Sequence, residues 1–215
     1  MHVPRPAPAG FVRSHTRPAR PSLVPEVRLL VAADVVALWE AMEAEGGGAG
    51  EEPPFWAAAW PGGQALARHV LDAPDVVADR RVLDLGSGSG LVAVAAAAAG
   101  AREVVASEVD RFGVTAIALN AELNGAGPIR VVGDVLGDEP PDVDVVLAGD
   151  VCYDRGMTER VWPFLTAARA RGSEVLVGDP GRPYLPQDRL VAVGAYDVPE
   201  TEGPGTRRTT VWRVP

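Results

Sequence analysis

The chain has 215 residues, and its 20 basic side chains, all arginine, face 29 acidic ones, for a net charge of −9. This length suits one α/β domain that buries roughly 70% of its unfolded surface. The acidic balance argues against general nucleic-acid binding, which needs a basic face. The longest apolar run, residues 91–99, is too short to span a bilayer, so no membrane contact is expected.

The few cysteines and histidines exclude other kinds of site. Cys152 is the single cysteine, so an internal disulfide and a thiolate metal cluster are excluded. His2, His15 and His69 are too scattered to form a ligand set, and no metal is expected. Residues 1–28 are rich in arginine and proline but have no apolar segment like that of a secretory signal, so the expected location is the cytoplasm.

The N-terminal part is expected to extend a single larger domain. Residues 1–28 are predicted to be extended, and whether this arm contacts a partner is left open. Apolar residues at helical spacing predict a helix over 31–45, and the glycines of 46–50 predict a linker. These features divide the chain into residues 1–50 and a domain of residues 51–215.

Within the larger domain, strands and helices alternate, which predicts a doubly wound, mostly parallel sheet of the Rossmann type. A helix over 64–71 precedes this alternation, and an antiparallel hairpin of 190–198 and 208–214 closes the chain. The predicted strands are 81–85, 103–108, 129–132, 143–148 and 174–178, and the helices between them are 90–99, 111–124 and 158–170.

A glycine-rich turn identifies the cofactor. The segment Val82–Gly90 reads as a strand followed by a turn that opens a helix. A dinucleotide fingerprint has its third glycine where this chain has Leu91, and Asp84 would repel a pyrophosphate. A cofactor with a cationic centre, an ammonium group and a ribose but no phosphate suits the turn better. That cofactor is S-adenosylmethionine, whose product is S-adenosylhomocysteine.

Acidic residues follow successive strands at the sheet edge where ligands bind in such folds. Glu108 is placed to accept hydrogen bonds from the ribose hydroxyls, and the adjacent Val109 is included in the cofactor site. Asp84 is expected to hold the methionine ammonium, directly or through water. Asp134 and the backbone of Val135 are expected to meet the adenine edge.

The acceptor is expected beside the fourth strand, which the segment Gly149–Asp154 follows. Asp150 and Tyr153 supply a carboxylate and a phenol that can hold an amine and steady the charge during in-line displacement. An amine must arrive neutral, so a base or a proton path to water is needed. The Asn-Pro-Pro-aromatic loop of DNA-amine and glutamine methyltransferases is absent.

These motifs together resemble the class I seven-strand methyltransferases, in the branch that modifies protein lysines. Three segments, Pro54–Leu66, Gly149–Asp154 and Gly178–Pro183, make the chain similar to the electron transfer flavoprotein beta-subunit lysine methyltransferase family from about residue 11 to the end. The resemblance implies the strand order 3-2-1-4-5-7-6 and methylation of a lysine on that subunit. The basic, proline-rich arm resembles bacterial members.

The resemblance also assigns roles to individual positions. Trp60 and Gly63 would line the cofactor pocket, with Trp60 near the methionine or the adenosine. Gly86, Ser87 and Gly88 would form its floor. Asp150 and Tyr153 would gate the acceptor, and the loop from Asp179 to Arg182 would cover the substrate entrance. Glu108 stands where this group more often has aspartate.

Two other functions stay open on the sequence. The first is methylation of a small-molecule amine, because such enzymes share the same cofactor half. The second is a cofactor-binding fold kept as an interaction module without catalysis. The target lysine, the number of methyl groups transferred and the oligomeric state are also left open.

Overall fold

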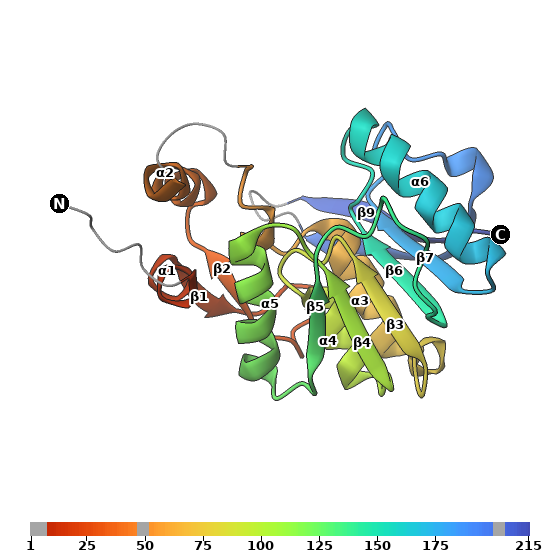
Figure 1. Cartoon of the computed structure of the whole chain (residues 1–215), viewed down its shortest axis with the longest axis horizontal. Coiled ribbons are helices and arrows are strands. Elements are labelled where there is room, and N and C mark those ends of the chain that lie inside the picture. The colour runs from red at the N-terminus through yellow and green to blue at the C-terminus, as the bar shows by residue number, and fades with distance from the viewer. Residues whose placement is uncertain (1–7, 47–51, 200–204) are drawn as a thin grey trace.

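The computed structural model describes residues 8–46, 52–199 and 205–215. Its centre is a seven-stranded sheet in the spatial order β5-β4-β3-β6-β7-β9-β8 (Figure 1). Counted along the chain from β3, this order is 3-2-1-4-5-7-6, which confirms the prediction. The strands are β3 (Arg81–Leu85), β4 (Glu103–Ser107), β5 (Ile129–Val132), β6 (Val145–Gly149), β7 (Glu174–Asp179), β8 (Val191–Pro199) and β9 (Thr206–Arg213).

The first five of these strands pair in parallel, whereas β9 runs antiparallel to β7 and β8 antiparallel to β9. Alternate residues of the central strands point to opposite faces, so Val82 and Leu147 enter one buried cluster while Leu83 and Val146 enter another. Burial on both faces explains why these strands are nearly continuous apolar runs.

Helices cover the two faces unequally (Figure 1). The apolar cluster on one face contains side chains of α3 (Pro61–Asp72), α4 (Leu91–Ala98) and α5 (Arg111–Asn124). The cluster on the other face contains side chains of α6 (Arg155–Ala170). Three short 3-10 helices, at Phe55–Ala57, Pro74–Val76 and Gln187–Arg189, complete the helical elements of this domain in the described residues.

Local caps determine where these helices begin and end. The carboxylate of Asp110 accepts hydrogen bonds from the first turn of α5, which ends at Gly125 in the left-handed conformation. Asp154 caps α6 through the N–H of Met157 at 2.7 Å, so this helix begins three residues before the predicted start at 158. α3 begins at Pro61 rather than residue 64 because proline suits the first helical position.

The N-terminal segment differs from the prediction. Part of the stretch predicted to be extended forms α1 (Pro8–His15) and then β1 (Thr16–Ala19), which pairs antiparallel with β2 (Leu29–Ala32). The predicted helix over 31–45 is α2 (Val35–Gly46), which begins after Asp34, whose carboxylate accepts hydrogen bonds from the first turn. The start predicted at residue 31 was therefore wrong.

Contacts with α5 hold this N-terminal segment in place. The ring of Phe11 packs on Phe112 with centroids 4.5 Å apart, and the N–H of Leu30 donates to Oδ1 of Asn120 at 2.8 Å. The N-terminal helical extension is thus confirmed, while the division at residue 50 stays a prediction. The arm before residue 8 and most of the glycine linker lie outside the described residues. Within the described part of the chain, no helix is long and apolar enough to cross a membrane.

Candidate functional site

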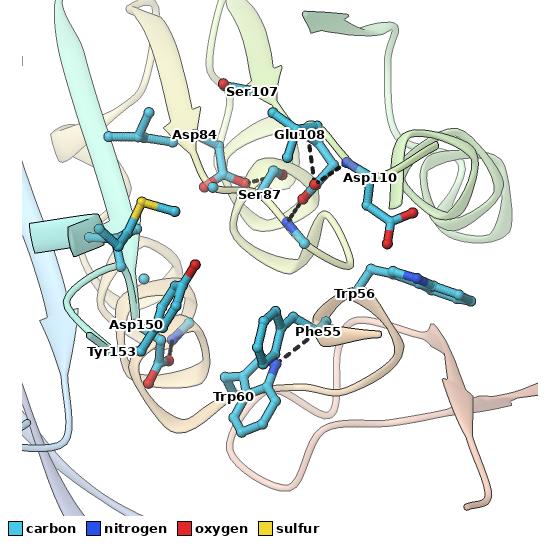
Figure 2. Close-up of a pocket in the computed structure, with 18 of the residues that line it drawn as sticks. Phe55, Trp56, Trp60, Asp84, Ser87, Ser107, Glu108, Asp110, Asp150 and Tyr153 are labelled. Carbon is cyan, nitrogen blue, oxygen red and sulfur yellow. Dashed lines mark hydrogen bonds between the residues drawn. The ribbon is translucent and has the colours of Figure 1, made fainter. Parts of the chain in front are cut away.

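A pocket of about 500 Å³ opens at the carboxyl ends of β3, β4 and β6. All of the predicted site residues line it except Val135 and Asp179. Figure 2 shows Asp84, Ser87 and Glu108 on one side of this space, with Phe55, Trp60 and Tyr153 facing them from the other. The predicted residues that line the pocket are Trp60, Gly63, Asp84, Gly86, Ser87, Gly88, Glu108, Val109, Asp134, Asp150, Tyr153 and Arg182.

The turn after β3 requires glycine. Gly86, Gly88 and Gly90 have φ angles of 65°, 53° and 80°, in the left-handed region that side chains with a Cβ disfavour. A Cβ on Gly86 would also approach Val151 to 3.2 Å. The chain can therefore reverse from β3 into α4 with its backbone open to the pocket.

Asp84 lies under this turn and is almost completely buried. Its Oδ2 accepts a hydrogen bond from the hydroxyl of Ser87 at 2.5 Å (Figure 2). The same oxygen accepts one from the N–H of Ala93 at 3.0 Å. Burial raises the pKa of Asp84 to about 7, against the opposing effect of these two donors. Near neutral pH the carboxyl group can thus lose its proton readily when a cation approaches.

Glu108 joins the end of β4 to the glycine turn. Its Oε2 accepts a hydrogen bond from the N–H of Gly88 at 2.8 Å, and its Oε1 accepts from Val109 and Asp110 at 2.7 and 2.9 Å. Burial raises the pKa of this carboxyl group, while the three backbone donors lower it. Gly113, which the sequence analysis did not single out, makes room for this side chain, because a Cβ there would lie 2.9 Å from Cγ of Glu108.

The segment after β5 brings Asp134 and Leu136 to the pocket. Asp134 reaches the pocket, where it pairs with Arg160 of α6. The N–H of Leu136 and the Arg160 guanidinium lower the pKa of Asp134. The side chains of Val135 and Leu136 both pack against the cluster that contains α6, and Leu136 also lines the pocket. The predicted contact of the Val135 backbone with the adenine stays a prediction.

The three segments that carried the family resemblance meet in space. The N-terminus of α3 lies directly on the ends of β6 and β7. A Cβ on Gly178 would lie 2.1 Å from the carbonyl oxygen of Gly62, and one on Gly149 would lie 2.8 Å from Cα of Gly63. Only glycine permits this approach, so the glycines of the three segments serve one contact.

Asp150 connects the N-terminus of α3 to the turn after β7. Its backbone has a φ of 57°, and its carboxylate is buried. Oδ2 accepts a hydrogen bond from the N–H of Gly63 at 2.9 Å, and Oδ1 accepts one from Nη2 of Arg182 at 2.9 Å. Burial raises the pKa of Asp150, and Arg182 opposes that shift. Both oxygens are therefore engaged in holding α3 and the turn after β7, and the predicted contact with an amine stays a prediction.

Asp179 supports Arg182 from outside the pocket. Its side chain is fully buried, and its Oδ1 accepts hydrogen bonds from the N–H groups of Gly181 and Arg182, both at 2.7 Å. Burial raises the pKa of this carboxyl group. Asp179 thus supports the turn that carries Arg182, and its predicted role in substrate binding stays a prediction.

Three aromatic rings line the outer part of the pocket. Phe55, Trp60 and Tyr153 have exposed fractions of 39%, 39% and 38%. The indole N–H of Trp60 donates to the carbonyl oxygen of Phe55 at 2.7 Å (Figure 2). No role was predicted for Phe55, which lines the pocket beside the predicted Trp60.

Comparisons with known proteins agree with this geometry. A model of the family described as ribosomal protein L11 methyltransferase (PrmA) matches residues 65–150. A putative RNA methyltransferase from Pyrococcus horikoshii is similar in structure, with a TM-score of 0.53 and 20% identity, over 77% of this chain and 89% of that one. At this identity the likeness shows the fold alone.

Relatives found by sequence similarity identify the family more narrowly than the structural neighbour does. The electron transfer flavoprotein beta subunit lysine methyltransferase of Rattus norvegicus is 39% identical over 74% of this chain, which spans 66% of that relative's length. The protein of the same description from Xenopus laevis is 35% identical, over 95% of this chain and 86% of the relative. These relatives come from animals and give no support to the expected bacterial type. The chain belongs to the electron transfer flavoprotein beta subunit lysine methyltransferase family.

Proposed function

We propose that this protein transfers a methyl group from S-adenosylmethionine to a lysine of a protein, and that the electron transfer flavoprotein beta subunit is its substrate. One observation carries the proposal. A single pocket joins the glycine turn and its buried acids to Asp150 and Tyr153, where an acceptor would enter. The substrate is taken from the description of the relatives in the same family.

The residues of the pocket suit S-adenosylmethionine better than a phosphate-bearing cofactor. Among the described residues that line the pocket, the cationic side chains are Arg160 and Arg182, and each is already paired with an acid. The other charged side chains among these lining residues are acidic, Asp84 and Glu108 included, so the pocket carries a net negative charge that attracts a cation and repels a phosphate. When bound, the cofactor supplies a methyl group on a sulfonium that the nitrogen of an amine can accept.

Each end of this cofactor has a candidate partner. Glu108 would take the ribose hydroxyls, because its two oxygens keep lone pairs beside the three backbone donors. Asp84 would hold the ammonium group as a carboxylate. Asp134 and Leu136 would lie along the adenine, and Val109 beside them.

The acceptor amine must be neutral before it can react, because a protonated amine has no lone pair. Burial and nearby acids raise the pKa of Tyr153, so its phenol remains neutral and can hydrogen-bond to the amine without acting as a base. Both oxygens of Asp150 already accept hydrogen bonds. We therefore propose that the proton of the lysine leaves to water at the exposed mouth of the pocket, while Tyr153 orients the nitrogen.

The test is transfer of isotopically labelled methyl from S-adenosylmethionine to purified electron transfer flavoprotein subunits, with a cell lysate in parallel. Label on the beta subunit that mass spectrometry maps to a lysine supports both the chemistry and the target. A beta subunit with chemically blocked lysines is the matched control and should remain unlabelled. The cytoplasmic location expected from the sequence stays part of this proposal.

Other outcomes separate the alternatives. Label only on another protein would keep lysine methylation and remove the proposed target. Label only in small molecules would favour an amine of low molecular weight as the substrate. Binding of S-adenosylhomocysteine without any transfer would favour an interaction module. The exposed aromatic mouth favours a protein, because a long lysine side chain can enter it from a partner's surface.

A further inference from the structure

Two aromatic rings from distant parts of the chain meet at the mouth of the pocket. Phe55 precedes α3, Tyr153 precedes α6, and their ring centroids lie 5.5 Å apart. Both rings line the pocket and leave more than a third of their surface exposed. Large rings kept partly in water at the rim of a cavity are typical of ligand contact rather than of core packing.

The adjacent residue Trp56 is buried, in contrast to Phe55. Trp56 is 1% exposed and packs on Phe112, with ring centroids 6.2 Å apart, in a buried cluster that also contains Phe11. Adjacent aromatic side chains thus point in opposite directions, one into the core and one into the pocket (Figure 2). Trp60 fixes the outward position, because its N–H donates to the carbonyl oxygen of Phe55 and its ring contacts that of Phe55 edge-on.

The electrostatic surroundings of these rings are mostly negative. Glu52 and Asp154 line the same part of the pocket. Burial is the largest cause of the raised pKa of Tyr153, the charges of Asp154, Glu52 and Glu108 raise it further, and the charge of Arg160 lowers it. A negative potential that disfavours a phenolate also favours a cation at the same place.

We propose that Phe55 and Tyr153 form a cation-binding wall that receives the alkylammonium end of the substrate side chain, which makes Phe55 a specificity-determining residue. The proposal rests on the proposed function, because it concerns the acceptor half of that site. Ring faces attract an ammonium group within about 6 Å of the centroid, and partial desolvation strengthens the attraction. The wall therefore attracts the lysine as it arrives in its protonated form, before the proton leaves to water. It attracts the side chain again after methylation, when the nitrogen once more carries a positive charge.

The test measures binding of Nα-acetyl-Nε,Nε,Nε-trimethyllysine amide, whose charge does not depend on pH, to the full chain with and without saturating S-adenosylhomocysteine. A neutral analogue that carries a tert-butyl group in place of the quaternary ammonium has the same shape. We expect the cation to bind roughly 2- to 30-fold more tightly than the neutral analogue, as measured by ligand-observed NMR titration.

Substitutions assign this preference to the wall. Phe55→Leu keeps an apolar side chain and removes one π face of the wall, so the preference for the cation should decrease, whereas Phe55→Tyr should retain it. Tyr184→Leu is the matched control, because Tyr184 is 41% exposed but does not line the pocket, and it should change nothing. Thermal unfolding of each variant verifies that it folds.

Equal binding of the two analogues, binding of neither, or an unchanged preference in Phe55→Leu would overturn the inference. These results are independent of the methyl-transfer assay. Transfer to a protein lysine without a preference for the cation would remove the wall and keep the function. A preference for the cation without any transfer would remove the function and keep the wall.

Discussion

The floor and the mouth of the pocket are built in different ways. The floor, formed by Asp84, Ser87, Gly88 and Glu108, is tied to its own backbone by short hydrogen bonds within one strand-turn-helix unit and the next strand. The mouth brings together Phe55 and Tyr153 from distant segments, and their rings stay partly exposed. A rigid floor suits a cofactor of fixed shape, and an open mouth suits a side chain presented by a partner.

The largest effect is expected from Gly88→Val, which breaks the floor. A β-branched residue at a φ of 53° is strained, and its side chain would enter the space above the turn. The affinity for S-adenosylhomocysteine, measured by calorimetry, should fall by at least about 100-fold. Gly127→Val is the control, because a Cβ there meets nothing within 4 Å. Unchanged affinity in Gly88→Val would remove the turn from the cofactor site.

Asp150→Ala tests the junction between floor and mouth. The change removes the acceptor for the N–H of Gly63 and leaves the Arg182 guanidinium without its carboxylate. We expect methyl transfer to fall by at least about 100-fold, because the acceptor side loses its alignment. Asp150→Asn tolerates the positive φ and keeps one acceptor, so it should lose less activity. Full activity of the alanine variant, measured as kcat/KM, would place the catalytic role elsewhere.

The floor should also respond to pH. Burial raises the pKa of Asp84 to about 7, and a cationic ammonium group binds the ionised form of this carboxyl group. The affinity for S-adenosylmethionine should therefore decrease below about pH 7, by up to about tenfold per pH unit, and level off above it. Calorimetry at several pH values measures this slope. Asp84→Asn should bind more weakly and without the slope, and a slope that persists in it would refute the assignment.

The smallest effect is expected from Tyr153→Phe at the mouth. The variant keeps the ring that faces Phe55 and removes only the hydroxyl group. If the phenol orients the amine by one hydrogen bond, kcat should fall by about 2- to 15-fold, which corresponds to about 0.5–1.5 kcal/mol. Binding of the trimethyllysine probe should not change. A loss of that binding would mean that the hydroxyl group, rather than the ring, attracts the cation.

Local sequence patterns were enough to predict the sheet and most of the floor. Strands buried on both faces appear as apolar runs, and the glycine turn with Asp84 and Glu108 lies within one strand-turn-helix unit and the end of the next strand. The strand order came from the family resemblance. The N-terminal segment could not be predicted in this way. α1 and the β1–β2 pair are held by contacts with α5, such as that of Phe11 with Phe112, which no local pattern shows.

The sequence by itself determined the fold and the glycine turn with its neighbouring acids, and it predicted which segments carry the acceptor residues. Only the tertiary structure decided that Asp150 holds α3 and Arg182, that Leu136 rather than Val135 lines the pocket, and that Phe55 faces Tyr153. The physical reason is the range of the interactions. The floor depends on hydrogen bonds between nearby residues, whereas the mouth depends on packing between segments that meet only after the sheet has formed.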